Sequence, residues 1–181
     1  MRELADAERI RRFIRALGRE AQEDATAYLT GGATAVLVGW RASTIDIDLK
    51  LMPEHDELLR ALSRLKDELR INVELASPAD FIPVPAGWEG RSIFIVREGR
   101  LAFYHFDPYA QALAKVERAH TQDLADVDAL VQGGLVDPAL ALGYFDEIEP
   151  ELYRFPAVDP RSFRTRVEAA FRGNRPQASV E

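Results

Sequence analysis

The chain has no cysteine and few histidines, and both shortages exclude kinds of site. Its 181 residues contain no Cys and three His. Without thiols there are no disulfides, no thiolate-bound zinc and no cysteine nucleophile, and the chain is compatible with a reducing compartment. The histidines, at positions 55, 105 and 120, are scattered along the sequence. A His-rich metal site is therefore not expected.

The chain also lacks an excess of basic charge and a long apolar run. Its 23 Lys and Arg residues face 30 Asp and Glu residues, which gives a net charge of −7. Broad, sequence-independent binding to nucleic acid needs a large basic face, so this balance argues against it. No apolar stretch is long enough to span a bilayer, and the first residues are charged. We expect no membrane association and a cytoplasmic location.

Two acids separated by one residue are the first candidate site. Asp46 and Asp48 alternate with apolar residues on a predicted strand, where side chains two apart share a face. Ile45, Ile47 and Leu49 are expected to bury the other face of the strand. Two close carboxylates repel each other unless a hard divalent cation such as Mg²⁺ or Mn²⁺ neutralises them. The pattern therefore predicts a metal site that is completed by phosphate oxygens.

A pair of glycines before these acids predicts a phosphate site. Gly31 and Gly32 open a short apolar helix, so that a phosphate can approach the backbone and the unpaired N–H groups of the helix N-terminus. Arg41 is a candidate second phosphate ligand, because its planar guanidinium matches phosphate oxygens. Ser43 and Thr44, between the helix and the acids, are candidate contacts to the nucleotide.

Periodicity and turn residues predict an α/β (α+β) fold, a mixed sheet flanked by helices with a C-terminal helical extension. We expect an N-terminal helix that ends near Tyr28 (residues 1–27), a core over 28–106, a helical part over 107–172 packed on the core, and a mobile tail over 173–181. The elements expected in the core are strands at 28–30, 44–51 and 71–76, helices at 32–39 and 54–69, and a hairpin at 91–96 and 101–106.

The order of these motifs resembles the DNA polymerase β-like nucleotidyltransferase superfamily, and within it the AbiEii-type toxin nucleotidyltransferases and related small bacterial domains. The resemblance implies a third carboxylate on a later strand, which is Glu74 here. It also implies a lysine on a later helix, Lys115, followed by an acidic pattern that starts at Asp123 and includes Asp126. Relatives often place a basic residue just before that pattern, where this chain has Thr-Gln.

The resemblance implies a metal-dependent transfer of a nucleoside monophosphate from a nucleoside triphosphate to an acceptor hydroxyl. Asp46, Asp48 and Glu74 would hold Mg²⁺ or Mn²⁺, and Glu74 would help to activate the acceptor. Lys115 would neutralise charge on the leaving group. Relatives of the AbiEii type act as toxins paired with an antitoxin protein, and some transfer nucleotides to transfer RNA ends. This implies an RNA acceptor and an antitoxin partner.

Other interpretations of the same residues remain open. Acids on a strand also occur at exposed sheet edges, where they prevent pairing with other chains. A single acid such as Glu74 is often a solvent-facing residue, and Lys115 is equally compatible with a solvated helix face. The fold can also carry a catalytically silent nucleotide-sensing or protein-interaction module. A metal-dependent phosphohydrolase would use similar carboxylates, but this chain lacks the set of histidine ligands that accompanies them.

Overall fold

The structure, a computed structural model, describes residues 3–173, and these residues form two units. The first unit comprises residues 3–77 and 89–107, and the second comprises residues 78–88 and 108–173. The first unit holds all of the strands that the structure describes, and the second is helical.

A five-stranded mixed sheet in the order β5-β4-β2-β7-β6 forms the centre of the first unit. Strand β4 pairs antiparallel with β2 and parallel with β5, whereas β7 pairs parallel with β2 and antiparallel with β6. This confirms the predicted α/β fold with a mixed sheet and a terminal hairpin. The strands are β2 (Ala25–Thr30), β4 (Asp46–Met52), β5 (Asn72–Leu75), β6 (Ile93–Glu98) and β7 (Leu101–His105).

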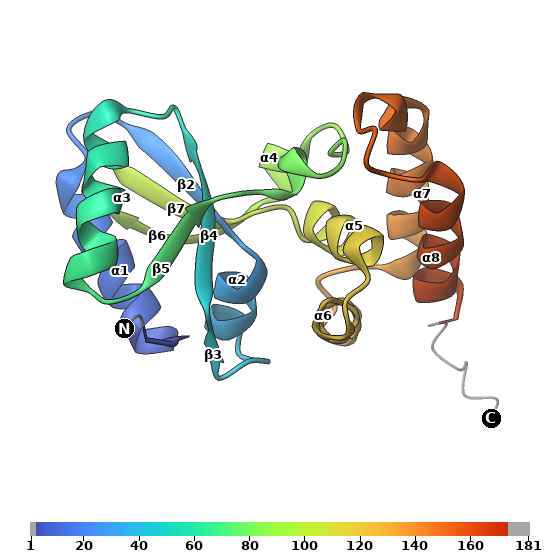
Figure 1. Cartoon of the computed structure of the whole chain (residues 1–181), viewed down its shortest axis with the longest axis horizontal. Helices are drawn as coiled ribbons and strands as arrows, with labels where there is room; N and C mark the ends of the chain where they lie inside the picture. Colours follow the sequence, from blue (N-terminus) through green and yellow to red (C-terminus); the bar gives the residue numbers. More distant parts are fainter. Residues whose placement is uncertain (1–2, 174–181) are drawn as a thin grey trace. The chain divides into compact units, whose positions relative to one another are not determined.

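Helices α1 (Ala7–Glu20) and α3 (Asp56–Glu68) lie side by side on one face of this sheet (Figure 1). Apolar residues at helical spacing, such as Phe13 and Leu17 in α1, are fully buried against alternate strand residues. The opposite face of the five-stranded sheet, called the open face below, carries the remaining alternate residues, most of them polar.

Helix α1 is shorter than the sequence predicted, because it ends at Glu20 and not near Tyr28. Residues 25–30 form β2 instead, which pairs with a neighbour on each side. The alternation of Thr with Ala, Tyr and Leu in this segment suits a strand with two different faces. Pairing on both sides therefore prevails over continuation of the helix.

The start of the acidic strand also differs from the prediction. Ser43 and Thr44 form a separate short strand, β3, which pairs antiparallel with β1 (Ala5–Asp6). Ile45 lies between β3 and β4 and is 70% exposed, so the expectation that it is buried was wrong. The chain changes from one sheet to the other at this residue. Helix α2 (Gly31–Val38) connects β2 to this segment.

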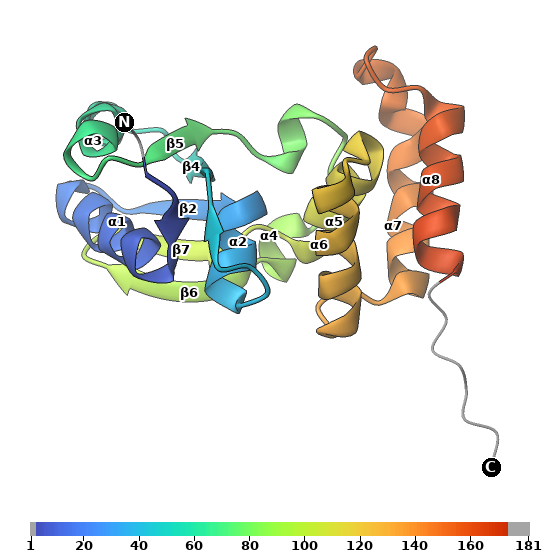
Figure 2. The same cartoon turned by 60° about the horizontal axis from the view of Figure 1, so that its bottom comes forward.

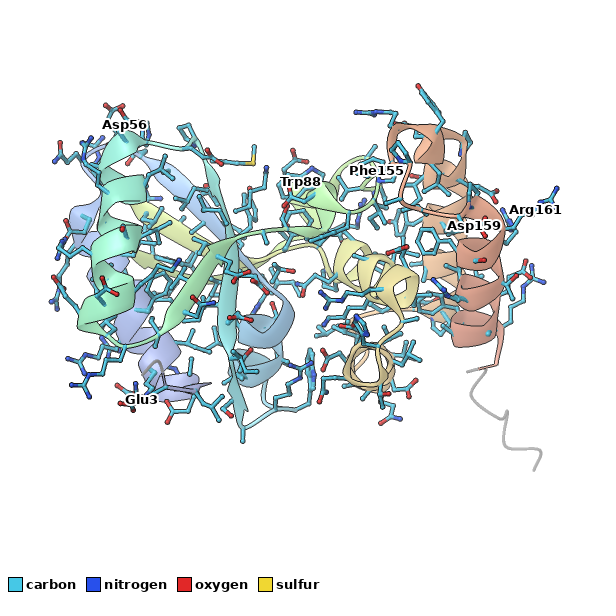
Figure 3. The ribbon with its side chains drawn as sticks, in the orientation of Figure 1. Glu3, Asp56, Trp88, Phe155, Asp159 and Arg161 are labelled. Atoms are coloured by element: carbon cyan, nitrogen blue, oxygen red, sulfur yellow. The ribbon has the colours of Figure 1, made fainter. Side chains whose placement is uncertain are left out.

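The second unit contains four helices of more than two turns: α5 (Pro108–Arg118), α6 (Thr121–Gln132), α7 (Pro138–Ile148) and α8 (Pro160–Arg172). Helices α7 and α8 run side by side (Figure 2). Asp159 caps α8 by accepting a hydrogen bond from the backbone N–H of Arg161 at 3.1 Å (Figure 3). The short elements are η1 (Pro78–Asp80), α4 (Trp88–Arg91) at the boundary between the units, and η2 (Glu149–Arg154).

In the described part of the chain no helix is both long and apolar enough to cross a bilayer. The mobile tail predicted for residues 173–181 lies, from residue 174 on, outside the described residues. The packing of the helical part on the core stays a prediction.

Candidate functional site

The predicted acids of β4 lie on the open face. Asp46 and Asp48 are partly exposed, while Ile47 and Leu49 between and beside them are fully buried against the helices. Strand β4 has β5 on one side and β2 on the other, so it is an internal strand. Protection of a sheet edge therefore does not explain these two charges.

Glu74 lies on the same face as the two acids. In the parallel pair of β4 and β5, Asp48 is the register partner of Glu74, and Asp46 is the partner of Asn72. Register partners project to the same side of a sheet, so three carboxylates and one amide share the open face on two neighbouring strands. Like charges directly opposite each other destabilise a sheet, which makes this arrangement costly without a cation.

Asn72 is a member of this group that the sequence analysis missed. Its side-chain nitrogen Nδ2 donates to Oδ1 of Asp46 at 2.5 Å and to Oε1 of Glu74 at 3.0 Å. The amide thus links the first and the third carboxylate of the site. Only the register of β4 and β5 reveals this role, because an asparagine in a strand carries no signal by itself.

The two glycines lie at the N-terminus of α2, next to the acids. Gly31 has a φ of +60°, and a Cβ atom there would come within 3.1 Å of Oδ2 of Asp48. Thr30, the residue before Gly31, is the register partner of Asp48 on β2. The backbone at the start of α2 and the carboxylate of Asp48 are therefore close neighbours, and their phosphate and metal roles stay predictions.

Gly32 allows helix α2 to pack closely against Thr44. A Cβ atom at this position would lie 1.9 Å from Oγ1 of Thr44 and 2.6 Å from its Cβ. Thr44 is itself fixed, since its hydroxyl donates to the backbone carbonyl of Asp46 at 3.0 Å and its side chain is only 9% exposed. The glycine thus brings α2 against the segment that leads into the acidic strand.

We predict that Gly32→Ala displaces α2 from β3 and destabilises the protein by about 1–3 kcal/mol, as overpacking of a filled core does. Thermal unfolding of the variant measures this loss. In the double variant Gly32→Ala/Thr44→Ala the nearest clash is removed, so we expect part of the stability to return. Gly143→Ala, the same change in helix α7, is the matched control, because no atom lies within 4 Å of the added Cβ there. A Gly32→Ala variant as stable as the wild type would contradict the prediction.

Arg41 and Ser43 lie in the segment between α2 and β4. Helix α2 ends at Val38 and is capped by Gly39, whose φ is +117°, and the backbone N–H of Arg41 donates to the carbonyl of Ala35 at 3.3 Å. Ser43 pairs with Asp6 in the small sheet, and both Arg41 and Ser43 are partly exposed. Their contacts to a phosphate stay predictions.

Lys115 lies in the second unit and is paired there. Its ammonium Nζ is 2.7 Å from Oδ2 of Asp126 and 3.5 Å from Oδ1 of Asp123, and all three side chains are almost completely buried. Arg118 makes a two-point contact with Asp123, at 2.8 and 2.6 Å. Arg118 thus supplies a second cation beside the acidic pattern. The leaving-group role of Lys115 stays a prediction.

The pKa of Asp123 reflects these contacts. Burial alone would raise the pKa of this carboxyl, but the hydrogen bond from Arg118 and the charges of Lys115 and Arg118 outweigh burial and lower it. A carboxyl whose pKa is lowered by folding stabilises the folded state above its unfolded pKa. This contribution is lost as the pH falls through the folded pKa. The contacts of Asp123 with Arg118 and Lys115 therefore contribute stability to the second unit at neutral pH.

A buried histidine behind the glycine turn was also missed. His105 Nδ1 lies 3.0 Å from the hydroxyl of Thr34 in α2, and this hydroxyl donates to the carbonyl of Leu29 at 3.3 Å. Burial lowers the pKa of His105 to about 4, so its imidazole is neutral at pH 7. Since the hydroxyl has one proton, it accepts the Nδ1–H of His105. This relay ties the first turn of α2 to β7 and β2.

A comparison of the chain with known protein families gives a match that is consistent with the geometry of the open face. Residues 8–151 match the family described as nucleotidyltransferase of unknown function (DUF6036). The matched segment includes Gly31, Gly32 and the three carboxylates. Neither the comparison with curated proteins nor the comparison with solved structures gave a match. With most of its length matched, the chain belongs to this nucleotidyltransferase family.

Proposed function

We propose that this protein transfers a nucleoside monophosphate from a nucleoside triphosphate to an acceptor hydroxyl with the help of a divalent cation. One observation carries the proposal: Asp46, Asp48 and Glu74 share the open face, and the glycine turn at Gly31 lies beside Asp48. Carboxylates for a cation and backbone N–H groups for a phosphate are thus adjacent.

The donor set fits Mg²⁺ or Mn²⁺ by its chemistry. Mg²⁺ is bound in proteins by one or two carboxylates, while substrate phosphates and water complete its shell. Residues 3–173 contain no group of three or more Asp, Glu, His or Cys side chains that is already gathered as a ligand set. Asp46 and Asp48 would hold the ion, and Glu74 would join them. When bound, such an ion stabilises the negative charge that develops on the transferred phosphoryl group.

The residues of the chain supply the remaining steps. The backbone at Gly31 and Gly32 binds and orients the phosphates, and Arg41, in the segment that follows α2, adds a cation. The acceptor oxygen forms a bond to the α-phosphorus while the bond to the pyrophosphate group breaks. Glu74, the most exposed of the three acids, takes the proton of the acceptor hydroxyl. Asn72 positions Glu74 and Asp46 relative to each other.

The resemblance to AbiEii-type enzymes supports a narrower proposal, in which the acceptor is RNA and the protein is a toxin that an antitoxin restrains. This role, like the cytoplasmic location, stays a prediction. Expression of the wild type and of Asp46→Asn in growing cells tests it: a toxin arrests growth only with its acids intact, and harmless expression of the wild type speaks against the role.

Incubation of the purified protein with each α-labelled nucleoside triphosphate, Mg²⁺ and total cellular RNA or protein tests the proposed activity. The double variant Asp46→Asn/Asp48→Asn is the matched control. We expect label to appear in an acceptor only with the wild type and only when Mg²⁺ is present. Label in RNA or in protein identifies the class of acceptor.

Mg²⁺-dependent nucleotide binding without transfer to any acceptor, abolished in the double variant, would favour the nucleotide-sensing module over the enzyme. Absence of both transfer and binding would contradict the assignment of the acids as a metal and nucleotide site.

A further inference from the structure

A second row of side chains crosses the open face next to the acids. Lys50 on β4 is the register partner of Tyr28 on β2, Tyr28 is the partner of Tyr104 on β7, and Tyr104 is the partner of Phe94 on β6. We call these four residues the Lys50–Phe94 row. Lys50 lies two residues after Asp48, so the row runs about 7 Å from the row that contains Asp48 and Glu74.

The three rings of this row lie next to one another, with Tyr104 between Tyr28 and Phe94. The ring centroids of Tyr28 and Tyr104 are 5.8 Å apart, and those of Phe94 and Tyr104 are 5.4 Å apart with an edge-to-face angle of 72°. Tyr28 is buried, whereas Tyr104 is partly exposed and Phe94 is 57% exposed. The exposed parts of Phe94 and Tyr104 are adjacent ring area that a flat ligand can contact.

Lys50 is the cation of the row. It is partly exposed and makes no ion pair with any residue in the described part of the chain, although Asp48 is its neighbour on the open face. A lysine ammonium is a strongly hydrated point charge on a flexible stem and is a common ligand of phosphate. The row therefore offers a positive charge at the end nearer the acids and aromatic rings at the other end.

We propose that the Lys50–Phe94 row is the subsite for the nucleoside end of the nucleoside triphosphate. The inference rests on the proposed function, since the acids and the glycine turn fix the phosphates. Lys50 binds the phosphate nearest the sugar, and the base stacks on the exposed ring of Phe94 beside Tyr104. Tyr104 stands two strands from β4, about 10 Å across the sheet. A ligand with phosphates at one end and a flat base at the other spans this distance.

Calorimetric titration of the full chain with two ligands tests the subsite. Inorganic tripolyphosphate carries the phosphates alone, and each of the four nucleoside triphosphates adds sugar and base; all titrations contain Mg²⁺ and no acceptor. For Phe94→Leu we expect weaker binding of at least one nucleoside triphosphate by about five- to a hundredfold, since stacking on an aromatic ring is lost. Binding of tripolyphosphate stays unchanged. Lys50→Gln weakens the binding of both ligands.

Tyr153→Leu is the matched control, because Tyr153 is 79% exposed and lies in η2 of the second unit. It leaves both affinities as in the wild type. Three results overturn the subsite: unchanged binding of every nucleoside triphosphate by Phe94→Leu, an equal loss for tripolyphosphate, or unchanged binding by Lys50→Gln. Far-ultraviolet circular dichroism of each variant confirms that it is folded.

The same titrations separate this inference from the proposed function. If the wild type binds nucleoside triphosphates, the double variant Asp46→Asn/Asp48→Asn does not, and Phe94→Leu binds like the wild type, only the subsite is wrong. If the wild type does not bind them, or the double variant still does, the proposed function is wrong and the subsite with it.

Discussion

The single substitution Asp48→Asn is expected to lower the rate of nucleotide transfer by about a hundredfold to a thousandfold. Loss of one group that stabilises transition-state charge costs about 3–4 kcal/mol, and the metal-holding role proposed for Asp48 belongs to this class. Asparagine has the same size as aspartate but no charge. Single-turnover transfer of a labelled nucleotide at saturating nucleoside triphosphate measures the change in the chemical step.

The stability of Asp48→Asn should move in the opposite direction. Asp48 is directly opposite Glu74 in the β4–β5 register, and a like-charge pair in such a position destabilises a sheet by roughly 0.2–1 kcal/mol. Removal of this repulsion is expected to raise the free energy of unfolding by a similar amount, measured without Mg²⁺. Asp67→Asn, with the same charge change on the exposed part of α3, should alter neither property. Transfer at the wild-type rate would contradict the role of Asp48.

The second large effect is on stability. Lys115→Met is expected to lower the free energy of unfolding by about 3–5 kcal/mol, because it leaves the fully buried carboxylate of Asp126 without its ammonium partner. Asp123 keeps Arg118, so the loss arises mainly at Asp126. Urea unfolding of the wild type and the variant at pH 7 measures the difference.

A double variant identifies the cause of this loss. Lys115→Met/Asp126→Asn removes the buried charge together with its partner and is expected to recover a large part of the stability. Lys66→Met, on the partly exposed side of α3, serves as a control for the loss of a lysine charge. A destabilisation of Lys115→Met below 1 kcal/mol would show that the ion pair contributes little to the fold, and would favour a role for Lys115 elsewhere.

The fold was largely predictable because its signals are local. Alternation placed β4, β5 and the hairpin within a few residues of their observed ends, and the Pro and Gly residues between helices marked the helical part. The errors came where pairing between distant segments decides. The segment of β2 is held by β4 and β7, and β3 exists only because β1 pairs with it. Sequence periodicity contains no information about such partners.

The candidate site was predictable in its residue types and not in its connections. The spacing of Asp46 and Asp48 fixed their common face, and the order of motifs suggested Glu74. The register between strands then decided which other side chains join them: Asn72 from β5 and Lys50 beside the rings of Tyr104 and Phe94. A tightly packed Gly32 and a neutral His105 likewise became visible only with the neighbours in place.

The strict alternation in β4 has an evolutionary consequence. Ile47, Leu49 and Leu51 belong to the packed interior, whereas Asp46, Asp48 and Lys50 do not, so the two sets can change independently. Substitutions at the even-numbered positions could remove or change the chemistry of the open face and leave the packed interior unchanged. Related chains that retain the odd-numbered residues of this strand but have neutral ones between them would then be folded proteins that have given up turnover.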